Sequence, residues 1–393
     1  MKVSTGKVAA VSLAGLLLLA ACGDDGDSTS ATTAAASGST AAAGAGVDLK
    51  AAGCPETVKI ITDWAPEAEH GFLYQMFGAD AAIDAKGYSV SGKLMASGKE
   101  TGVNLQVISG GPLRGFSPPT SEMYQDESIL LGFVYTDEGI QFSASNPTVG
   151  VVAPFVKSPQ AIAWDPATYP DVKTVADLGT KGVKVRYFDS AAYMEFVVES
   201  GILKREQVSG DYDGSPSLFV ADGGKSATQI FASAEPYLWS KEVPEWGKPI
   251  SYQYIDDLGW KPYAQSLATK PDNITKYKDC FTKLVPVIQQ ATVDYVTNPA
   301  TTNALIVKTV KEFGSSWEYS EGVAAYAGET MKNDKLIANS PSGTLGDFDL
   351  ARVTDLITKA TPIYTAGGKA PKAGLTAEDV VTNQFIDKSI KLG

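Results

Sequence analysis

The chain has 393 residues, with 45 acidic against 33 basic side chains and a formal net charge of −12. No cluster of lysines and arginines is available to neutralise phosphates, so the composition argues against nucleic acid as a partner. One histidine rules out a multi-histidine metal centre, and neither HExxH nor GxSxG occurs. We therefore expect no enzyme, no metal and no cofactor.

The first 21 residues have the pattern of a secretory signal peptide, with Lys2 and Lys7 followed by a short apolar run. That run ends in Leu-Ala-Ala-Cys at residues 19–22, which resembles the lipobox of bacterial lipoproteins. The alternative is an ordinary secretory signal followed by an unrelated cysteine. We expect Cys22 to carry lipid that anchors the chain to the outer face of a membrane, and residues 22–53 to be a flexible tether.

The other two cysteines form an even pair in an oxidising compartment. Cys54 begins the region expected to fold, and Cys280 lies beside an apolar helical stripe. We predict a disulfide that ties the entering chain to a helix. Two buried free thiols are the alternative.

After Pro55 short strands alternate with helices. Residues 57–62 predict a buried strand, 70–87 a helix ended by Gly87, 103–109 the next strand, and 127–136 and 148–157 two more. The middle predicts a short helix from 174, a strand over 183–187 and a helix from near Ser190. From Ile274 onward, apolar residues recur at helical spacing and predict one buried stripe, namely Tyr277, Phe281, Leu284, Ile288 and Tyr295.

Strands joined by helical crossovers imply a mostly parallel sheet covered on both faces. The helical last third is expected to return to the first α/β unit. We therefore predict an α/β architecture of two lobes joined by crossings near 155–163 and 250–256. Lobe I would hold 54–158 plus 254–393, and lobe II would hold 159–253.

Four stretches resemble the substrate-binding lipoproteins of ABC importers, which have a type 2 periplasmic binding protein fold. Residues 61–74, ITDWAPEAEHGFLY, match the pyrimidine-binder pattern of a strand ending in Asp63-Trp64, a proline turn and His70 opening a helix. The other stretches are 132–166, 169–208 and 227–237. Within the family the chain is closest to the thiamine-precursor (pyrimidine), sulfonate, taurine and nitrate binders. It departs from the pyrimidine binders at Glu67 and Glu69 and in a longer, proline-rich loop over 110–128.

The resemblance implies a small-molecule ligand, an ABC permease with its ATPase as partners, a monomer, and a place on the extracytoplasmic face of the cell membrane. It also implies a ligand cleft at the carboxyl ends of strands. The candidate ligand-binding residues are Asp63, Trp64, His70, Gly110, Tyr135, Asp137 and Glu138 on lobe I, with Tyr187, Asp189, Ser190, Ala191 and Glu235 on lobe II.

Trp64 directly follows a strand, so its ring can form a wall on which a flat heteroaromatic ligand stacks; a core tryptophan is the alternative. Glu235 precedes Pro236 and can accept from an amino group or a protonated ring nitrogen, unless it is a solvated surface acid. The helix start at Ser190 and Ala191 fits an anion or a carbonyl oxygen. His70 is expected to make one hydrogen bond in the cleft; the alternative is a cap on the turn outside it.

These residues favour a planar nitrogen heterocycle, such as a thiamine-precursor pyrimidine, trapped by hinged closure of the lobes. A sulfonate, taurine or nitrate binder would need Arg or Lys in the cleft loops, which offer Arg114 and Arg186. The sequence is also compatible with a flavin binder of the same fold, and with a surface or signalling lipoprotein that has no transport role.

Overall fold

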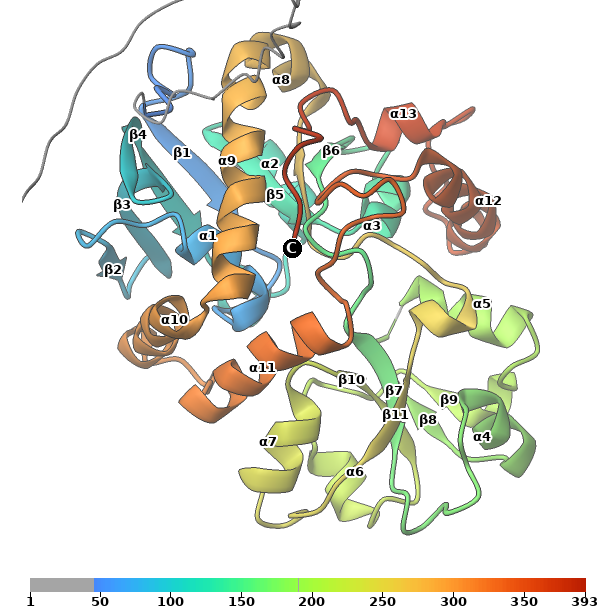
Figure 1. The fold of residues 1–393 in the computed structure, drawn as a ribbon. Helices are drawn as coiled ribbons and strands as arrows, with labels where there is room; N and C mark the ends of the chain where they lie inside the picture. The colour runs from blue at the N-terminus through green and yellow to red at the C-terminus, as the bar shows by residue number, and fades with distance from the viewer. Residues whose placement is uncertain (1–45, 190) are drawn as a thin grey trace, which may run out of the picture. The chain divides into compact units, whose positions relative to one another are not determined.

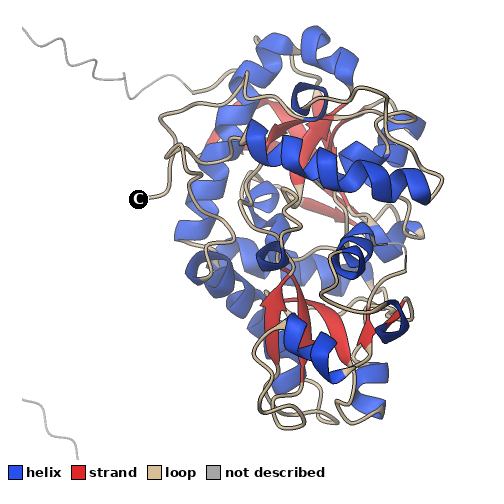
Figure 2. Cartoon of the chain, turned by 90° about the vertical axis from the view of Figure 1, so that its right-hand side faces the viewer, coloured by secondary structure: helices blue, strands red, loops and turns tan. Residues whose placement is uncertain are grey.

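The computed structural model describes residues 46–189 and 191–393 (Figure 1). The expected signal peptide, residues 22–45 of the expected tether with Cys22, and Ser190 lie outside the described residues. The expectation of a tether up to residue 53 is wrong for its last part: Leu49 is fully buried in the core, and its N–H donates to the carbonyl of Thr101 at 2.8 Å. Within the described ranges, no helix has the length and apolar character needed to cross a bilayer. The strands of this part form two separate sheets, each surrounded by helices (Figure 2).

Sheet I has seven strands in the order β2-β3-β4-β1-β5-β12-β6. Its inner strand β5 is buried at all six positions, as a largely apolar strand flanked on both faces should be. β1 runs parallel to both of its neighbours, whereas β12 is antiparallel to both of its own. The strands are β1 (Thr57–Ile61), β2 (Ala82–Asp84), β3 (Ser89–Ala96), β4 (Lys99–Ile108), β5 (Ile129–Val134), β6 (Val149–Val152) and β12 (Ser266–Thr269).

Sheet II has five strands in the order β11-β7-β10-β8-β9. They are β7 (Gln160–Trp164), β8 (Val185–Arg186), β9 (Val208–Ser209), β10 (Ala227–Phe231) and β11 (Ser251–Tyr254). The chain thus passes between the sheets twice, over 153–159 and 255–265. We call the parts around sheets I and II lobe I and lobe II; their exact boundaries at 158/159 and 253/254 stay a prediction.

The expectation of mostly parallel sheets is wrong. Six of the ten pairings between the described strands are antiparallel. Two causes can be named. The returning strand β12 enters sheet I between β5 and β6, and the chain before β4 doubles back as the hairpins β2-β3 and β3-β4.

The expected helix over 70–87 is also wrong. A 3-10 turn, η1 (Ala68–His70), leads into α1, which covers only Gly71–Tyr74. Farther on, Asp84 Oδ1 accepts from the backbone N–H groups of Lys86 and Gly87 at 3.1 Å each. A short side chain that satisfies the backbone locally in this way favours a turn over a helix, and here the turn joins β2 to β3.

One helix of the middle region has a defined cap at each end. Thr174 and Asp177 form a reciprocal capping box at the start of α4 (Val175–Lys181), and Gly182 ends it at φ 70°. The strand expected over 183–187 is shortened to β8. The other helices here are α5 (Ala192–Glu199), η3 (Arg205–Gln207), α6 (Ser217–Ala221) and α7 (Glu235–Lys241).

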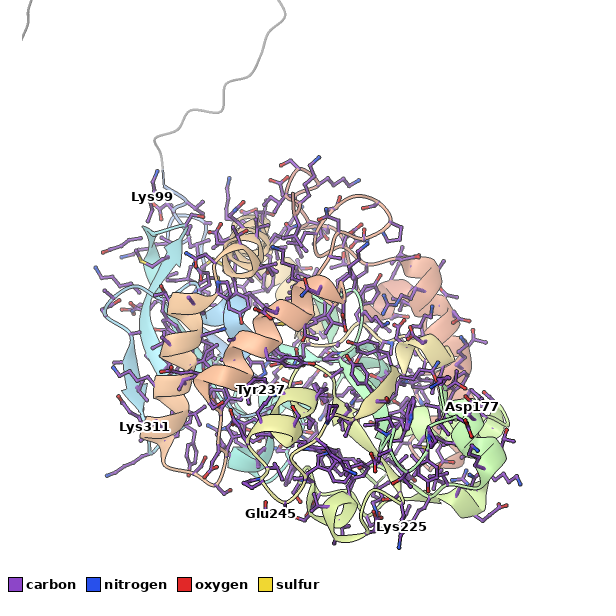
Figure 3. The ribbon with its side chains drawn as sticks, turned by 60° about the horizontal axis from the view of Figure 1, so that its bottom comes forward. Lys99, Asp177, Lys225, Tyr237, Glu245 and Lys311 are labelled. Carbon is purple, nitrogen blue, oxygen red and sulfur yellow. A yellow bond between two sulfur atoms is a disulfide. The ribbon has the colours of Figure 1, made fainter. Side chains whose placement is uncertain are left out.

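Four of the five residues of the predicted apolar stripe, Phe281, Leu284, Ile288 and Tyr295, are buried in α9 (Lys278–Thr297). The fifth, Tyr277, precedes the helix as its N-cap and is only half-buried. α9 packs across α1 on lobe I, but the chain after α9 (residues 298–393, here called the tail) also reaches lobe II (Figure 1). Tyr237 of α7 is labelled in Figure 3. The centre of its ring lies 5.7 Å from the centre of the Tyr326 ring on α11. The remaining helices are η2 (Gly111–Arg114), α2 (Pro119–Gln125), α3 (Thr136–Gln141), η4 (Asp256–Leu258), α8 (Pro271–Lys276), α10 (Ala300–Phe313), α11 (Glu321–Asn333), α12 (Leu350–Ala366) and α13 (Ala377–Val380).

The bridge predicted between Cys54 and Cys280 is present, although the two residues are 226 positions apart. Both are buried, at 8% and 0% exposure. The bridge joins the segment just before β1 to the first turn of α9, so it fastens the start of sheet I to the helix that covers it.

Candidate ligand-binding cavity

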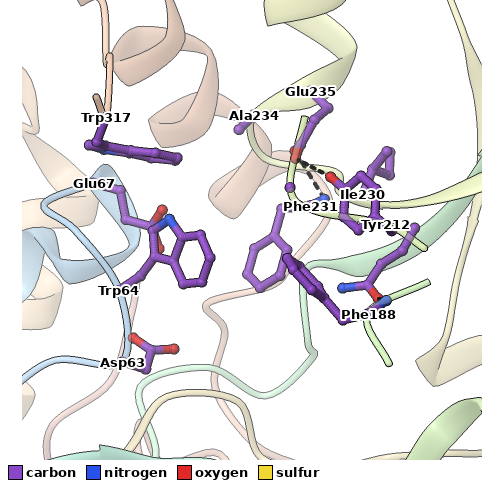
Figure 4. A pocket seen from close by; sticks show the side chains of 12 residues that line it. Asp63, Trp64, Glu67, Phe188, Tyr212, Ile230, Phe231, Ala234, Glu235 and Trp317 are labelled. Atoms are coloured by element: carbon purple, nitrogen blue, oxygen red, sulfur yellow. Dashed lines mark hydrogen bonds between the residues drawn. The ribbon is translucent and has the colours of Figure 1, made fainter. Parts of the chain in front are cut away.

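A cavity of about 80 Å³ lies between the loop that follows β1 and the end of β10 (Figure 4). Three of its lining residues come from the start of lobe I, and one, Trp317, comes from the tail. The other eight come from lobe II. The twelve are Asp63, Trp64, Glu67, Phe188, Tyr212, Gly214, Gln229, Ile230, Phe231, Ala234, Glu235 and Trp317.

Trp64 is the centre of the aromatic wall. Its ring lies 6.0 Å from Trp317 and 6.3 Å from Phe188, both edge-on. Phe188 continues the wall to Tyr212 at 4.9 Å. Figure 4 shows Trp64 and Trp317 on one side and Phe188 and Tyr212 on the other. The cavity is therefore bordered by rings from both lobes.

Two glycines allow the loop of Trp64 to pack where it does. A Cβ on Gly110 would lie 2.2 Å from the carbonyl oxygen of Thr62, and one on Gly111 would lie 2.8 Å from the Trp64 ring. The N–H of Gly110 also donates to the carbonyl of Trp64 at 3.2 Å. Gly110, expected in the cleft, thus supports Trp64 from behind and does not line the cavity.

Trp317 comes from the loop between α10 and α11 and was not predicted. Its indole N–H donates to the carbonyl of Pro66 at 3.1 Å. Two residues on, the Tyr319 hydroxyl accepts from the N–H of Ala68 at 3.0 Å. These bonds fasten the loop to the turn that carries Asp63 and Trp64.

Three carboxylates face the cavity, and none of its twelve lining residues is basic. Glu235 opens α7; its carboxylate accepts from the N–H of Phe231 at 3.0 Å and from the Tyr212 hydroxyl at 3.5 Å. Burial raises the pKa of Glu235 to about 7. Glu67 is 7% exposed, and burial together with the charges of Glu69, Asp63 and Glu235 raises its pKa well above the ordinary value.

The histidine lies one layer behind the cavity. His70 is fully buried, with its ring 5.1 Å from that of Phe133, and it does not line the cavity as expected. Its Nε2 is 3.0 Å from Asp63 Oδ1 and 3.6 Å from Glu67 Oε1. Gln265 Nε2 adds a contact of 3.3 Å to Asp63 Oδ2. His70 and Gln265 therefore hold the carboxylate of Asp63 at the cavity edge.

Three further predicted residues of lobe I, Tyr135, Asp137 and Glu138, lie outside the cavity lining, and the two acids bond to other side chains of the protein. Asp137 accepts from the indole N–H of Trp260 at 3.0 Å, and Glu138 accepts from the Thr120 hydroxyl at 2.9 Å. Burial raises both pKa values, that of Glu138 to about 8. Burial and the charges of Asp63 and Glu67 also raise the pKa of Tyr135.

The predicted loop of lobe II lies only partly at the cavity. Tyr187 and Asp189 line a separate pocket of about 250 Å³ beside α5 and the end of α12. Ala191 caps α5, and its N–H donates to the carbonyl of Phe188 at 3.2 Å. Phe188, which lies between Tyr187 and Asp189 in sequence, is the residue of this loop that reaches the cavity. Its N–H donates to the side-chain carbonyl of Gln229 at 3.2 Å.

Of the predicted residues, Asp63, Trp64 and Glu235 line the cavity. The lining residues that the sequence did not predict share no motif. Three of them, Gln229, Ile230 and Phe231, belong to strand β10, and the rest belong to loops. A partial signal was present, because β10 ends directly before Glu235 and the carboxyl ends of strands line such clefts. The missed lining residues are Glu67, Phe188, Tyr212, Gly214, Gln229, Ile230, Phe231, Ala234 and Trp317.

Two mixed sheets linked by two crossings define the fold of the periplasmic binding proteins. Solved structures of that class match the chain. The periplasmic aliphatic sulphonate binding protein SsuA from Escherichia coli has 17% identity and a TM-score of 0.52, over 86% of this chain and 94% of its own. The alkanesulfonate-binding protein SsuA from Xanthomonas axonopodis pv. citri, bound to MOPS, has 15% identity and a TM-score of 0.51, over 84% and 99%.

The ligand binding component of an ABC-type import system from Staphylococcus aureus, with zinc bound, has 9% identity and a TM-score of 0.50, over 86% of this chain and 100% of its own. No protein-family model matches the chain, and no curated protein is significantly similar to it. At sequence identities of 9–17%, the structural similarity shows the fold alone.

Proposed function

We propose that this protein is the extracytoplasmic solute-binding component of an ABC importer and that it captures a small planar nitrogen heterocycle, such as a thiamine-precursor pyrimidine. The observation that carries the proposal is the cavity itself, where Trp64 of lobe I faces Phe188 and Glu235 of lobe II. A solute held there touches both lobes. Its binding therefore shifts the population toward the closed arrangement that a permease can recognise.

The chemistry of the lining supports a flat, donor-bearing ligand. The rings of Trp64, Trp317 and Phe188 present apolar faces and edges against which a heteroaromatic ring packs, and such pairs add about 0.5–1.5 kcal/mol beyond area burial. The carboxylates of Glu235 and Asp63 accept hydrogen bonds from amino or protonated ring nitrogens. One flat ring fits the cavity's size better than a flavin does.

The same lining weighs against a sulfonate or nitrate, although two of the matched structures are sulfonate-binding proteins by their names. An anion needs cationic or N–H donors. Arg186 is paired with Asp211 at 2.5 Å and with Asp222 at 3.4 Å, and Arg114 lies 3.7 Å from Glu122. Neither arginine lines the cavity.

Lipid anchoring through Cys22, the monomeric state, and a permease with its ATPase as partners complete the proposal. They rest on the sequence resemblance and on the names of the matched proteins. The site calls for no catalytic step. Its groups bind and orient a solute, and no group of three or more metal-ligating side chains occurs within 46–189 and 191–393.

A thermal-shift screen of the purified protein tests the proposal. The panel holds pyrimidines, thiamine, flavins, sulfonates, nitrate and amino acids. A ligand at about a hundred times its Kd stabilises the fold by about 2.7 kcal/mol, which is a visible rise in Tm. We expect a rise with nitrogen heterocycles. A rise only with sulfonates or nitrate would overturn the ligand class, and no rise with any compound would favour a surface protein without a transport role.

A further inference from the structure

We infer that the cavity selects a solute carrying positive charge, so that a cationic heterocycle binds in preference to a neutral one of the same shape. The inference rests on the proposed function and narrows its ligand class. Two features of the cavity lining support it together: its acidic side chains and its aromatic side chains.

The charge of the lining is one-sided. Asp63, Glu67 and Glu235 are its ionisable carboxyl groups, and the twelve lining residues include no lysine, arginine or histidine. Asp63 has partners in His70 and Gln265, and Glu235 has partners in Phe231 and Tyr212. These partners orient the carboxylates toward the cavity edge but leave the space between them without a counter-charge from the lining.

Glu67 supplies an independent indication of a missing partner. It is 7% exposed and lines the cavity, and its Oε1 is 3.5 Å from Gln265 Nε2 and 3.6 Å from His70 Nε2. Both contacts are long for a carboxylate that is so nearly buried. A carboxylate held away from water with weak donors is costly, and a charged donor on a ligand in the cavity removes that cost.

The aromatic wall suits a cation as well as a ring. Trp64, Trp317, Phe188, Tyr212 and Phe231 border the same space, and the electron-rich faces of such rings attract a positive charge, most strongly those of Trp. A neutral ring gains the contact area alone. A cationic ring gains the contact area, the ring attraction and the pairing with Glu67 and Glu235, so its affinity is higher.

Calorimetric titration with matched pairs tests the inference. The first pair is 1-methylnicotinamide, a cation, against nicotinamide; the second is thiamine, a cation, against its neutral aminopyrimidine half. We expect the cation of at least one pair to bind about ten-fold or more tightly than its neutral partner, and no pair to show the reverse. Equal binding in both pairs, or tighter binding of the neutral member in either pair, would overturn the inference.

Two variants connect the preference to the named carboxylates. Glu67→Gln and Glu235→Gln keep the side-chain shape and are each expected to lower the affinity for the cation about ten-fold, while the neutral affinity changes little. Glu312→Gln, an exposed acid on α10, is the control and should change neither affinity. If both cavity variants keep the full preference for the cation, the inference is wrong.

Failure of this inference and failure of the proposed function are distinguishable. If no member of either pair binds but a neutral compound of the wider screen does, the charge inference fails and solute capture stands. If no compound of any charge binds, solute capture itself fails.

Discussion

The carboxylate of Glu69 accepts a hydrogen bond from the hydroxyl of Ser233, across 164 positions of the chain and from one lobe to the other. Both residues are buried, at 1% and 0% exposure. Glu69 lies in η1 next to the turn that carries Trp64, and Ser233 lies directly before the cavity residues Ala234 and Glu235. The bond therefore joins the two lobes directly beside the cavity residues.

Removing the donor of this bond should weaken closure. In Ser233→Ala, Glu69 Oε1 loses the hydroxyl that donates to it, and within the described part of the chain Oε2 already has no hydrogen-bond partner. We expect unfolding to become easier by about 1–3 kcal/mol and solute dissociation to become faster. Chemical denaturation and stopped-flow dissociation measure the two effects. Ser240→Ala is the matched control, since that hydroxyl donates within its own helix; equal effects in both variants would contradict the role of Ser233.

Loss of the central ring should lower affinity with little loss of stability. Trp64→Ala removes the ring that meets both Trp317 and Phe188, and we expect solute affinity to fall about 10- to 100-fold. Trp64→Phe should retain part of it. The control is Phe116→Ala: this ring is 59% exposed and lies 5.7 Å from Trp64 but outside the cavity lining. An unchanged affinity in Trp64→Ala would remove Trp64 from the site.

Affinity for a cationic solute should rise with pH. Burial raises the pKa of Glu235 to about 7, so this carboxyl gives up its proton near neutrality, and the ionised form attracts the cation. The carboxyl groups of Asp63, Glu67 and Glu69 lie nearby; burial raises the pKa of Glu67 well above its usual value and raises that of Glu69, and burial keeps Tyr212 protonated in this range. Titrations between about pH 6 and about pH 8 should show tighter binding at the higher pH. Glu235→Gln should flatten the profile; an unchanged profile would mean that Glu235 does not control it.

Stability should fall as pH rises toward 8. Burial raises the pKa of Glu138 from 4.5 to about 8. The folded state then binds this proton more tightly than the unfolded state, so the stabilisation is complete below 4.5 and is lost as pH rises through 8. The loss is up to about 1.4 kcal/mol per pH unit for one such group. Urea unfolding at several pH values should show a shallower slope in Glu138→Gln than in Glu312→Gln, and identical slopes would contradict the assignment.

Breaking the disulfide should destabilise the whole fold. The Cys54–Cys280 bridge closes a loop of more than half the chain, and its loss typically costs about 2–5 kcal/mol. We expect the double variant Cys54→Ser/Cys280→Ser to unfold at a lower denaturant concentration than the parent. Reductant should lower the midpoint of the parent and leave that of the double variant unchanged. A parent insensitive to reductant would contradict the bridge.

The sequence predicts the elements whose pattern is local. β1 and β5 are short apolar runs, and the α9 stripe has helical spacing over five turns. The sheet order is not local. β12 pairs with strands more than a hundred residues earlier, and the β2-β3-β4 hairpins depend on Asp84 satisfying a turn inside a helix-like apolar pattern.

The site was predictable where residues directly follow strands. Asp63 and Trp64 come just after β1, and Glu235 comes after β10. Phe188 was missed in favour of Tyr187 because β8 ends at Arg186, so alternation along the strand no longer decides which side chain faces inward. Trp317 could not be found, since its place at the cavity depends on contacts of its loop with Pro66 and Ala68, which lie 251 positions from Trp317 and Tyr319 respectively.

A crystal structure of the protein with the heterocycle that raises its Tm most tests the central claim most directly. The account predicts the ring of the bound compound between Trp64 and Phe188, with a nitrogen within hydrogen-bond distance of Glu235 and another polar contact to Asp63 or Glu67. A compound bound outside this cavity, or one that contacts residues of a single lobe, would contradict capture between the lobes.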